Sequence, residues 1–144
     1  MGQPGRHSHK FIAEMTSNNK QWRIELRGRI DHYILKVLSI LEKVQKDNIA
    51  RQLGDRLIES SLNIAMNYAQ SENSRSRTEF TDCFRLTLRN CNQSKIWLSL
   101  LKESKKIKIK DIEWYFEELT DFCKIFTSSI LKLEAQRINT SAKT

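Results

Sequence analysis

The scarcity of helix-breaking residues is the feature that most limits how this chain can fold. Its 144 residues include only four glycines and one proline, and neither residue type occurs after Gly54. Glycine and proline are the residues that most often interrupt helices and mark turns. A long interior without them favours an all-α fold. The length suits one domain, large enough to remove roughly 70% of its unfolded surface from water and so to bury a core.

Apolar residues recur every three or four positions in four stretches, which is the spacing of a helix with a buried face. The stretches cover about residues 22–44, 49–70, 76–103 and 111–136. Ser76 and Glu79 have the form of a capping box at the start of the third stretch, and Asp111 is placed to cap the fourth. Four helices of similar length with short connections predict an antiparallel up-down four-helix bundle.

The bundle is expected at residues 20–135, between a polar lead at 1–19 and a polar tail at 136–144. We expect both ends to be disordered. No apolar run approaches the roughly 18 residues that span a membrane, and the first residues, MGQPGRHSHK, lack the apolar segment of a signal peptide. We therefore expect a cytoplasmic protein that does not contact a membrane.

The second and third stretches each carry an extra apolar stripe that the core of a single bundle does not require. An exposed apolar surface is an aggregation risk unless another chain covers it, so we expect a homo-oligomer. In the fourth stretch, Trp114 and Ile125 are expected to point away from the core. The residues predicted to lie at the oligomer interface are Ile58, Leu62, Leu86, Trp97, Leu100 and Trp114.

Two serines and two asparagines, Ser60, Ser61, Asn63 and Asn67, stand among the apolar residues of the second stretch. Small or hydrogen-bonding side chains let helices approach and can fix which helices pair, provided that each buried polar group is satisfied. We interpret these four as packing residues and not as catalytic groups. Ser60, Ser61 and Asn67 are expected on the buried face.

The histidines and paired acids do not form an arrangement typical of an enzyme. His7 and His9 lie in the polar lead, and His32 stands alone on the first helix. Glu117 and Glu118 are adjacent, so they diverge by about 100° around a helix and cannot act as a pair. We find no nucleophile with a base.

The three cysteines, Cys83, Cys91 and Cys123, lack the spacing of a zinc site or a disulfide framework. We interpret them as reduced thiols of the core. No metal or cofactor is expected, and we predict that the protein is not an enzyme.

A strong excess of positive charge indicates the kind of partner. Lysine and arginine exceed aspartate and glutamate by eight, which favours a polyanion such as nucleic acid. Few aromatic residues are suited to stack on bases, so contacts with backbone phosphates are expected. An isolated run of lysines can also serve only to solvate a loop. The residues predicted to bind nucleic acid are Arg75 and Arg77 before the third helix, and Lys102, Lys105, Lys106, Lys108 and Lys110 after it.

Two segments, RLIESSLNIAMNYAQS and EFTDCFRLTLRNCNQSKIWLSLL, resemble a bacterial family called four helix bundle proteins. That family is first known from intervening sequences of large-subunit rRNA genes. The matching positions are Ser60, Ile64, Asn67, Tyr68, Glu79, Phe80, Leu88, Trp97 and Leu98, and the resemblance covers about residues 25–135. It implies a homo-oligomeric ring, usually a homopentamer. It also implies a distant relation to the accessory variability determinant of diversity-generating retroelements, which binds nucleic acid and a reverse transcriptase.

The chain departs from the family pattern at several polar positions. Glu59 stands where the family usually has arginine, and Gln70, Asn90 and Gln93 replace its acids. If those acids form ion pairs between helices in relatives, neutral hydrogen bonds are expected in their place here.

Together these features predict a non-enzymatic, basic, oligomeric helical bundle that binds nucleic acid, RNA before DNA, through backbone phosphates. The alternative is a protein–protein adaptor, for example to a reverse transcriptase in a retroelement-type ribonucleoprotein. Salt-sensitive RNA binding by the protein alone favours the first function. A protein partner without intrinsic RNA binding favours the second.

Overall fold

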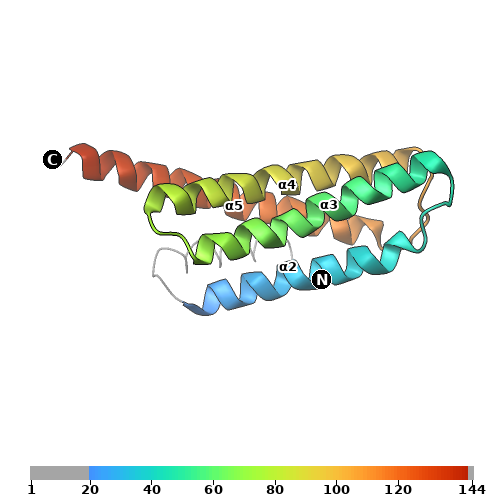
Figure 1. Ribbon diagram of the computed structural model, residues 1–144, viewed down its shortest axis with the longest axis horizontal. Helices are drawn as coiled ribbons and strands as arrows, with labels where there is room; N and C mark the ends of the chain where they lie inside the picture. Colours follow the sequence, from blue (N-terminus) through green and yellow to red (C-terminus); the bar gives the residue numbers. More distant parts are fainter. Residues whose placement is uncertain (1–19, 143–144) are drawn as a thin grey trace.

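The computed structural model describes residues 20–142, which form four helices. The helices are α2 (Lys20–Leu41), α3 (Asn48–Glu72), α4 (Arg77–Glu103) and α5 (Ile112–Ala142). Figure 1 shows them lying lengthwise along the molecule. Within the described residues there is no strand, and a single bridge joins Val44 to Ile107. The prediction of an all-α chain with four helices is confirmed.

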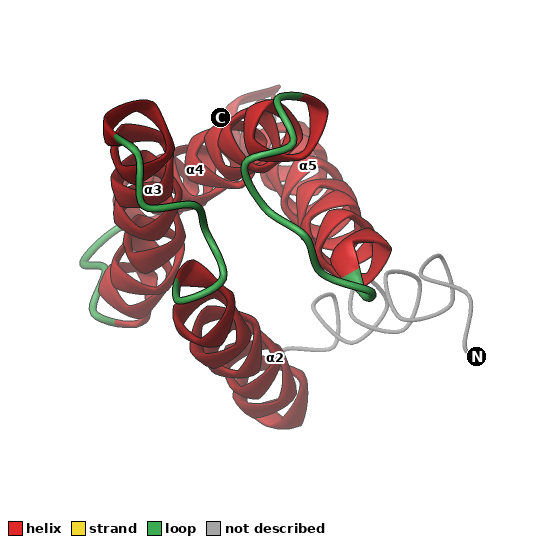
Figure 2. Ribbon diagram, turned by 90° about the vertical axis from the view of Figure 1, so that its right-hand side faces the viewer, coloured by secondary structure: helices red, strands yellow, loops and turns green. Residues whose placement is uncertain are grey.

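Contacts between α2 and α3, and between α4 and α5, join the start of one helix to the end of the other. The contacts are Arg23 with Tyr68, Leu41 with Gly54, Arg85 with Glu134, and Lys102 with Glu113. Figure 2, seen from one end, shows the four helices around a shared centre. The apolar stripes of all four helices meet there in one core.

Small hydroxyl side chains lie between α3 and α4, the pair with the most extensive backbone contact. Ser60 and Ser94 are buried and their hydroxyl oxygens are 2.7 Å apart. Ser61, also buried, has its hydroxyl 3.0 Å from that of Tyr33 on α2. Each buried hydroxyl therefore has a partner, and the short side chains let the two helices approach. This geometry agrees with the interpretation of Ser60 and Ser61 as packing residues.

Long side chains, by contrast, link α2 to α5. The Arg29 guanidinium contacts Glu118 and donates from Nη2 to Asp121 Oδ2 at 2.8 Å. It also lies over the Phe122 ring, 5.3 Å from the centroid. Asp121 is fully buried, so its charge depends on this arginine for compensation. The core is thus narrow between α3 and α4 and bridged by long side chains between α2 and α5.

Two residues lie elsewhere than the sequence pattern predicted. Ile125, expected to point outward, is 1% exposed and belongs to the core. Because α5 contacts both α4 and α2, its buried arc is wider than one apolar stripe. Asn67, expected on the buried face, is half-buried, and its amide donates to the Asn63 carbonyl of the same helix at 2.8 Å. The serines, and not the asparagines, supply the polar contacts inside the core.

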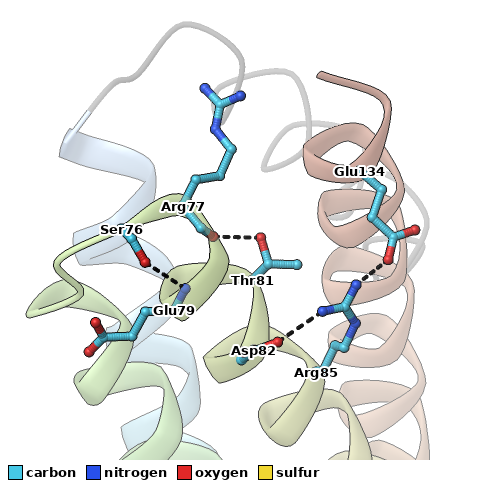
Figure 3. Close-up of polar contacts among 7 residues, drawn as sticks. All are labelled: Ser76, Arg77, Glu79, Thr81, Asp82, Arg85 and Glu134. Carbon is cyan, nitrogen blue, oxygen red and sulfur yellow. Dashed lines mark hydrogen bonds and ion pairs between the residues drawn. The ribbon is translucent and has the colours of Figure 1, made fainter. Parts of the chain in front are cut away.

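Polar capping explains where α3 and α4 begin. The Asp47 carboxylate accepts a hydrogen bond from the Ala50 backbone N–H at 2.9 Å, so α3 begins at Asn48. The preceding helix, α2, ends at Leu41, earlier than the expected residue 44. At α4, the Ser76 hydroxyl accepts from the Glu79 backbone N–H at 3.1 Å (Figure 3). Glu79 in turn accepts from the Arg75 backbone N–H, which differs from the reciprocal bond of a full capping box.

The last helix begins at Ile112, directly after Asp111, and ends later than expected. The Asp111 carboxylate accepts from Lys36 Nζ at 3.0 Å, and the Asp111 backbone carbonyl accepts from the Trp114 N–H at 3.0 Å. At the other end, α5 continues to Ala142, past residue 136, where we placed the start of a polar tail. No glycine or proline interrupts the helix there. The predicted lead at 1–19 lies outside the described residues.

Enlarging Ser94 tests the close contact between α3 and α4. We expect Ser94→Leu to destabilise the protein by about 1–3 kcal/mol, because a leucine overfills a fully packed interface. Urea unfolding followed by circular dichroism measures the change. Ser39→Leu, at an exposed position on α2, is the control and should change stability by less than about 0.5 kcal/mol. Equal stability of the two variants would contradict a close-packed contact.

Candidate functional site

Two connections that are far apart in the sequence meet at one end of the helices. Residues 42–47 join α2 to α3, and residues 104–111 join α4 to α5. The Gln45 backbone N–H donates to the Lys106 carbonyl at 2.9 Å, and Val44 forms a bridge with Ile107. Figure 1 shows both connections at the same end. The pairing of their backbones makes the two connections one surface.

This pairing brings lysines from both connections together. We name the set the basic end, and its residues are Lys43, Lys46, Lys105, Lys108 and Lys110. All five side chains are exposed, and none takes part in an ion pair among residues 20–142. Sequence reasoning found the last three only. Lys43 and Lys46 were missed because nothing in the local pattern shows that the two connections pair.

Two other lysines predicted to bind nucleic acid form ion pairs at this end. Lys106 Nζ lies 2.9 Å from Asp47 Oδ2, and Lys102 Nζ lies 2.9 Å from Glu113 Oε1. Lys106 compensates the carboxylate that caps α3, and Lys102 links α4 to α5. Both lysines are thus paired with acids of the chain, and their contact with nucleic acid stays a prediction.

Two acids at this end, Asp47 and Asp111, are stabilised in their charged form. Hydrogen bonds from the Ala50 backbone N–H and from Lys106 lower the pKa of Asp47 below its usual value of 3.8. A hydrogen bond from Lys36, with a further contribution from the charge of Lys43, lowers the pKa of Asp111. The basic end therefore keeps its internal acids ionised while its five exposed lysines face solvent.

Lys105 occupies the turn that ends α4. Its φ is 59°, in the left-handed region that glycine usually takes. The Lys106 N–H donates to the Leu101 carbonyl at 2.9 Å and the Lys105 N–H to the Lys102 carbonyl at 3.0 Å, which is a Schellman motif. This turn directs the chain from α4 towards connection 42–47. A lysine in this conformation costs roughly 1 kcal/mol relative to glycine.

The two predicted arginines lie at the opposite end. Arg75 stands in the connection between α3 and α4 and Arg77 opens α4, and both are exposed. Figure 3 shows the Arg77 side chain extending away from the helix, while Arg85 contacts Asp82 and Glu134. A small pocket of about 90 Å³ beside them is lined by Arg77, Thr78, Thr81, Arg85, Leu133, Glu134 and Arg137. The structure thus separates the predicted cations into two ends, as the sequence suggested.

The predicted interface residues do not share one face. On α3, Gly54, Ile58 and Leu62 follow one another at steps of four, and Gly54 faces Leu41 of α2. Ile58 and Leu62 therefore lie on the side of α3 towards α2. Leu35 and Leu38 of α2 and Met66 of α3 are also exposed and apolar, and we group them with Ile58 and Leu62 as one candidate surface. We name it the α2–α3 strip, and its residues are Leu35, Leu38, Ile58, Leu62 and Met66.

The predicted interface residues of α4 border a different surface. Leu86 and Leu100 are 43% and 45% exposed, while Trp97 packs partly against the core. Trp97 also lines a pocket of about 190 Å³ between α3 and α4, together with Arg56, Glu59, Ser60, Asn63 and Gln93. This surface is more polar than the α2–α3 strip.

Two positions that depart from the family pattern bond within their own helices. Glu59 pairs with Arg56 at 3.8 Å, and the Asn90 amide donates to the Leu86 carbonyl at 2.8 Å. For Asn90 the polar contact is a neutral hydrogen bond made within α4. A polar side chain on a helix can reach the carbonyl four residues earlier, and here that local bond is made.

Trp114, the remaining predicted interface residue, is half-buried near α2. It packs edge-on against Tyr115 and His32, and Lys36 Nζ lies 4.3 Å from its ring centroid. Most of the Trp114 ring therefore contacts other residues of the same chain. His32 is exposed and contacts this ring.

Within residues 20–142 there is no cluster of three or more side chains that could hold a metal ion. None of the four helices combines the length and apolar character needed to cross a membrane.

Comparisons with known proteins bear on the fold. No protein-family model matches the sequence, and no curated protein matches it. One similar solved structure is a protein of unknown function from the S23 ribosomal protein family of Bacteroides thetaiotaomicron. Its TM-score is 0.68 at 18% sequence identity, over 75% of this chain and 96% of that chain. The likeness shows the fold.

Acid should weaken the cap of α3 at the basic end. Because the folded pKa of Asp47 is below 3.8, its contribution to stability is complete above that value and is lost as the pH falls through the lowered pKa. We expect Asp47→Asn to be less stable than the native protein near pH 6 and to differ less from it near pH 3. Urea midpoints at both pH values measure this, with the exposed Asp55→Asn as control. A difference independent of pH would contradict the role of the charge.

Proposed function

We propose that the protein is an antiparallel up-down four-helix bundle that assembles into a homo-oligomer and binds nucleic acid, with RNA the first candidate, through backbone phosphates. The observation that carries the proposal is the basic end. Its five exposed lysines come from two connections joined by backbone hydrogen bonds, and none of them forms an ion pair within the described residues. Such a surface attracts a polyanion.

The placement of the aromatic residues favours phosphate contacts over base recognition. None of the tryptophans, tyrosines and phenylalanines within residues 20–142 is exposed; they are buried or half-buried. Proteins that read single-stranded bases use exposed aromatic rings for stacking. Lysines contact phosphates without regard to sequence. The proposed binding is therefore sensitive to salt and weakly selective for sequence.

Self-association would multiply these contacts. In the α2–α3 strip, the exposed fractions of Leu35, Leu38, Leu62 and Met66 are 64%, 46%, 45% and 65%. The proposal is that a second copy of the chain packs against these residues. In a closed ring, here a homopentamer by family resemblance, the basic end is repeated around the axis. Several weak phosphate contacts then act together, which raises affinity and steepens its salt dependence.

A protein–protein adaptor is the second candidate. The more polar surface beside Trp97 lies apart from the α2–α3 strip and leaves Leu86 and Leu100 exposed. It offers a place for a protein such as a reverse transcriptase while the basic end contacts nucleic acid. Binding to that protein without any RNA binding by the chain alone would favour this function.

Reversing one lysine from each connection tests the basic end. We expect Lys46→Glu with Lys108→Glu to weaken RNA binding at least tenfold and to flatten the slope of log Kd against log salt by about 2 per subunit engaged. Fluorescence anisotropy with a mixed-sequence RNA measures both quantities. Arg89→Glu with Lys124→Glu is the matched control, since it changes the net charge equally at exposed positions within α4 and α5. Equal loss in both variants would contradict a localised site.

Placing a charge on each apolar surface tests the assembly. We expect Leu62→Asp to dissociate the oligomer with helical circular dichroism retained, because a buried carboxylate is disfavoured at an interface. Light scattering measures the mass, and Leu131→Asp, at an exposed position on α5, is the control. Trp97→Asp tests the second surface in the same way. A native mass in both Leu62→Asp and Trp97→Asp would contradict assembly through either surface.

A further inference from the structure

A pocket of about 360 Å³ lies beside the basic end, where the end of α2, connection 42–47 and the first turns of α3 meet. Apolar groups from these three segments form part of its lining, namely Leu41, Val44, Ala50 and the backbone of Gly54. Lys46, a residue of the basic end, also lines it. The volume is at the lower end of the roughly 300–1,000 Å³ that is usual for small-molecule pockets. The pocket can therefore hold one small group next to the lysines.

Gly54 keeps part of this pocket open. It is buried in the second turn of α3, although glycine is among the least favourable residues inside a helix. Its φ is not positive, so its backbone conformation does not require glycine. A Cβ added to Gly54 would lie 3.5 Å from Leu41 Cδ2, which is an ordinary contact, so packing within the chain does not require glycine either. Close approach of a ligand to the backbone is a further reason for glycine at such a position.

Charged side chains of both signs surround the apolar lining. Lys46 and Arg51 supply two cations, and Glu42 and Asp55 supply two carboxylates. All four side chains are exposed, and none of them forms an ion pair within residues 20–142. Gln45 adds an amide, which can both donate and accept hydrogen bonds. Because the charges balance, the pocket suits an uncharged group with apolar faces and a polar edge better than it suits a free anion.

A nucleobase is a group of this kind, and in a nucleic acid it is attached to phosphates. Its edge carries hydrogen-bond donors and acceptors, and its faces are broad and flat. We propose that the pocket receives one unpaired nucleobase of an RNA whose neighbouring phosphates contact the lysines of the basic end. The inference rests on the proposed function and adds a contact with a base to the contacts with phosphates. Bases of single-stranded RNA can turn out of the stack to enter such a pocket.

This contact concerns one nucleotide for each subunit. The other nucleotides contact only lysines, which hold phosphates without regard to sequence. Binding therefore stays weakly selective for sequence, but it should require that bases are present. An RNA backbone without bases should bind through the lysines alone.

Removing the bases while keeping the phosphates tests the proposal. The probes are a short single-stranded RNA of mixed sequence and an abasic ribose-phosphate chain of the same length, both fluorescently labelled. We expect the native protein to bind the RNA about fivefold more tightly than the abasic chain at one salt concentration, measured by fluorescence anisotropy. Gly54→Leu places a side chain in the pocket, so it should bind both chains with the affinity that the native protein has for the abasic chain.

Gly28→Leu is the matched control. It makes the same substitution at an exposed helical glycine of α2, where an added Cβ meets nothing within 4 Å. Gly28 lies roughly 20 Å along α2 from Leu41. This variant should keep the fivefold preference for the RNA. Circular dichroism checks that both variants remain helical. If Gly54→Leu loses its helical signal, Gly54→Ala takes its place, since it adds only the Cβ and should still reduce the preference.

Each contrary outcome separates the pocket from the lysines. Equal binding of the two chains by the native protein would overturn the role of the pocket and leave phosphate binding by the basic end in place. An unchanged preference in Gly54→Leu, or in Gly54→Ala where it is used, would also overturn that role, because the base would then be contacted elsewhere. No binding of either chain at low salt would contradict the proposed function itself, and the inference would fail with it.

Discussion

The buried contact between Ser60 and Ser94 is the interaction on which the rest of the structure depends. Hydroxyl oxygens 2.7 Å apart allow little sliding of α3 along α4. They therefore set the register of these two helices, which have the most extensive backbone contact in the bundle. That register places the start of α3 level with the end of α4. Connections 42–47 and 104–111 then meet, and their backbones pair through Gln45 and Lys106. A leucine in place of either serine would force α3 and α4 apart. The two connections would then no longer be held close enough to pair.

The proposed function combines an exposed cluster of lysines with an exposed apolar surface. Exposed lysines gather at one end, where the internal acids are already compensated by Lys36, Lys102 and Lys106. The exposed apolar side chains of the α2–α3 strip lie on α2 and α3. A second copy covering the strip would leave the lysines open to a polyanion. Assembly and binding can therefore operate together, with phosphates contacted by several subunits at once.

The sequence predicts the fold well because helical periodicity is local. Four apolar stripes give four helices, and the serines of α3 are correctly placed in the core. Ile125 was misplaced because α5 is covered from two sides, which one helix's own pattern does not reveal. Asn67 was misplaced because a local bond to Asn63 competes with burial. The position of Lys43 and Lys46 beside the later lysines depends on backbone bonds between distant segments. No spacing in the sequence encodes these.

Light scattering after size exclusion, with and without a mixed-length RNA and at low and moderate salt, tests the central claim most directly. The account predicts a multimer whose mass increases with RNA at low salt and returns to that of the protein alone at moderate salt, since the contacts are with phosphates. A multimer indifferent to RNA at both salt concentrations would contradict the role of the basic end. A monomer under all conditions would contradict the assembly as well.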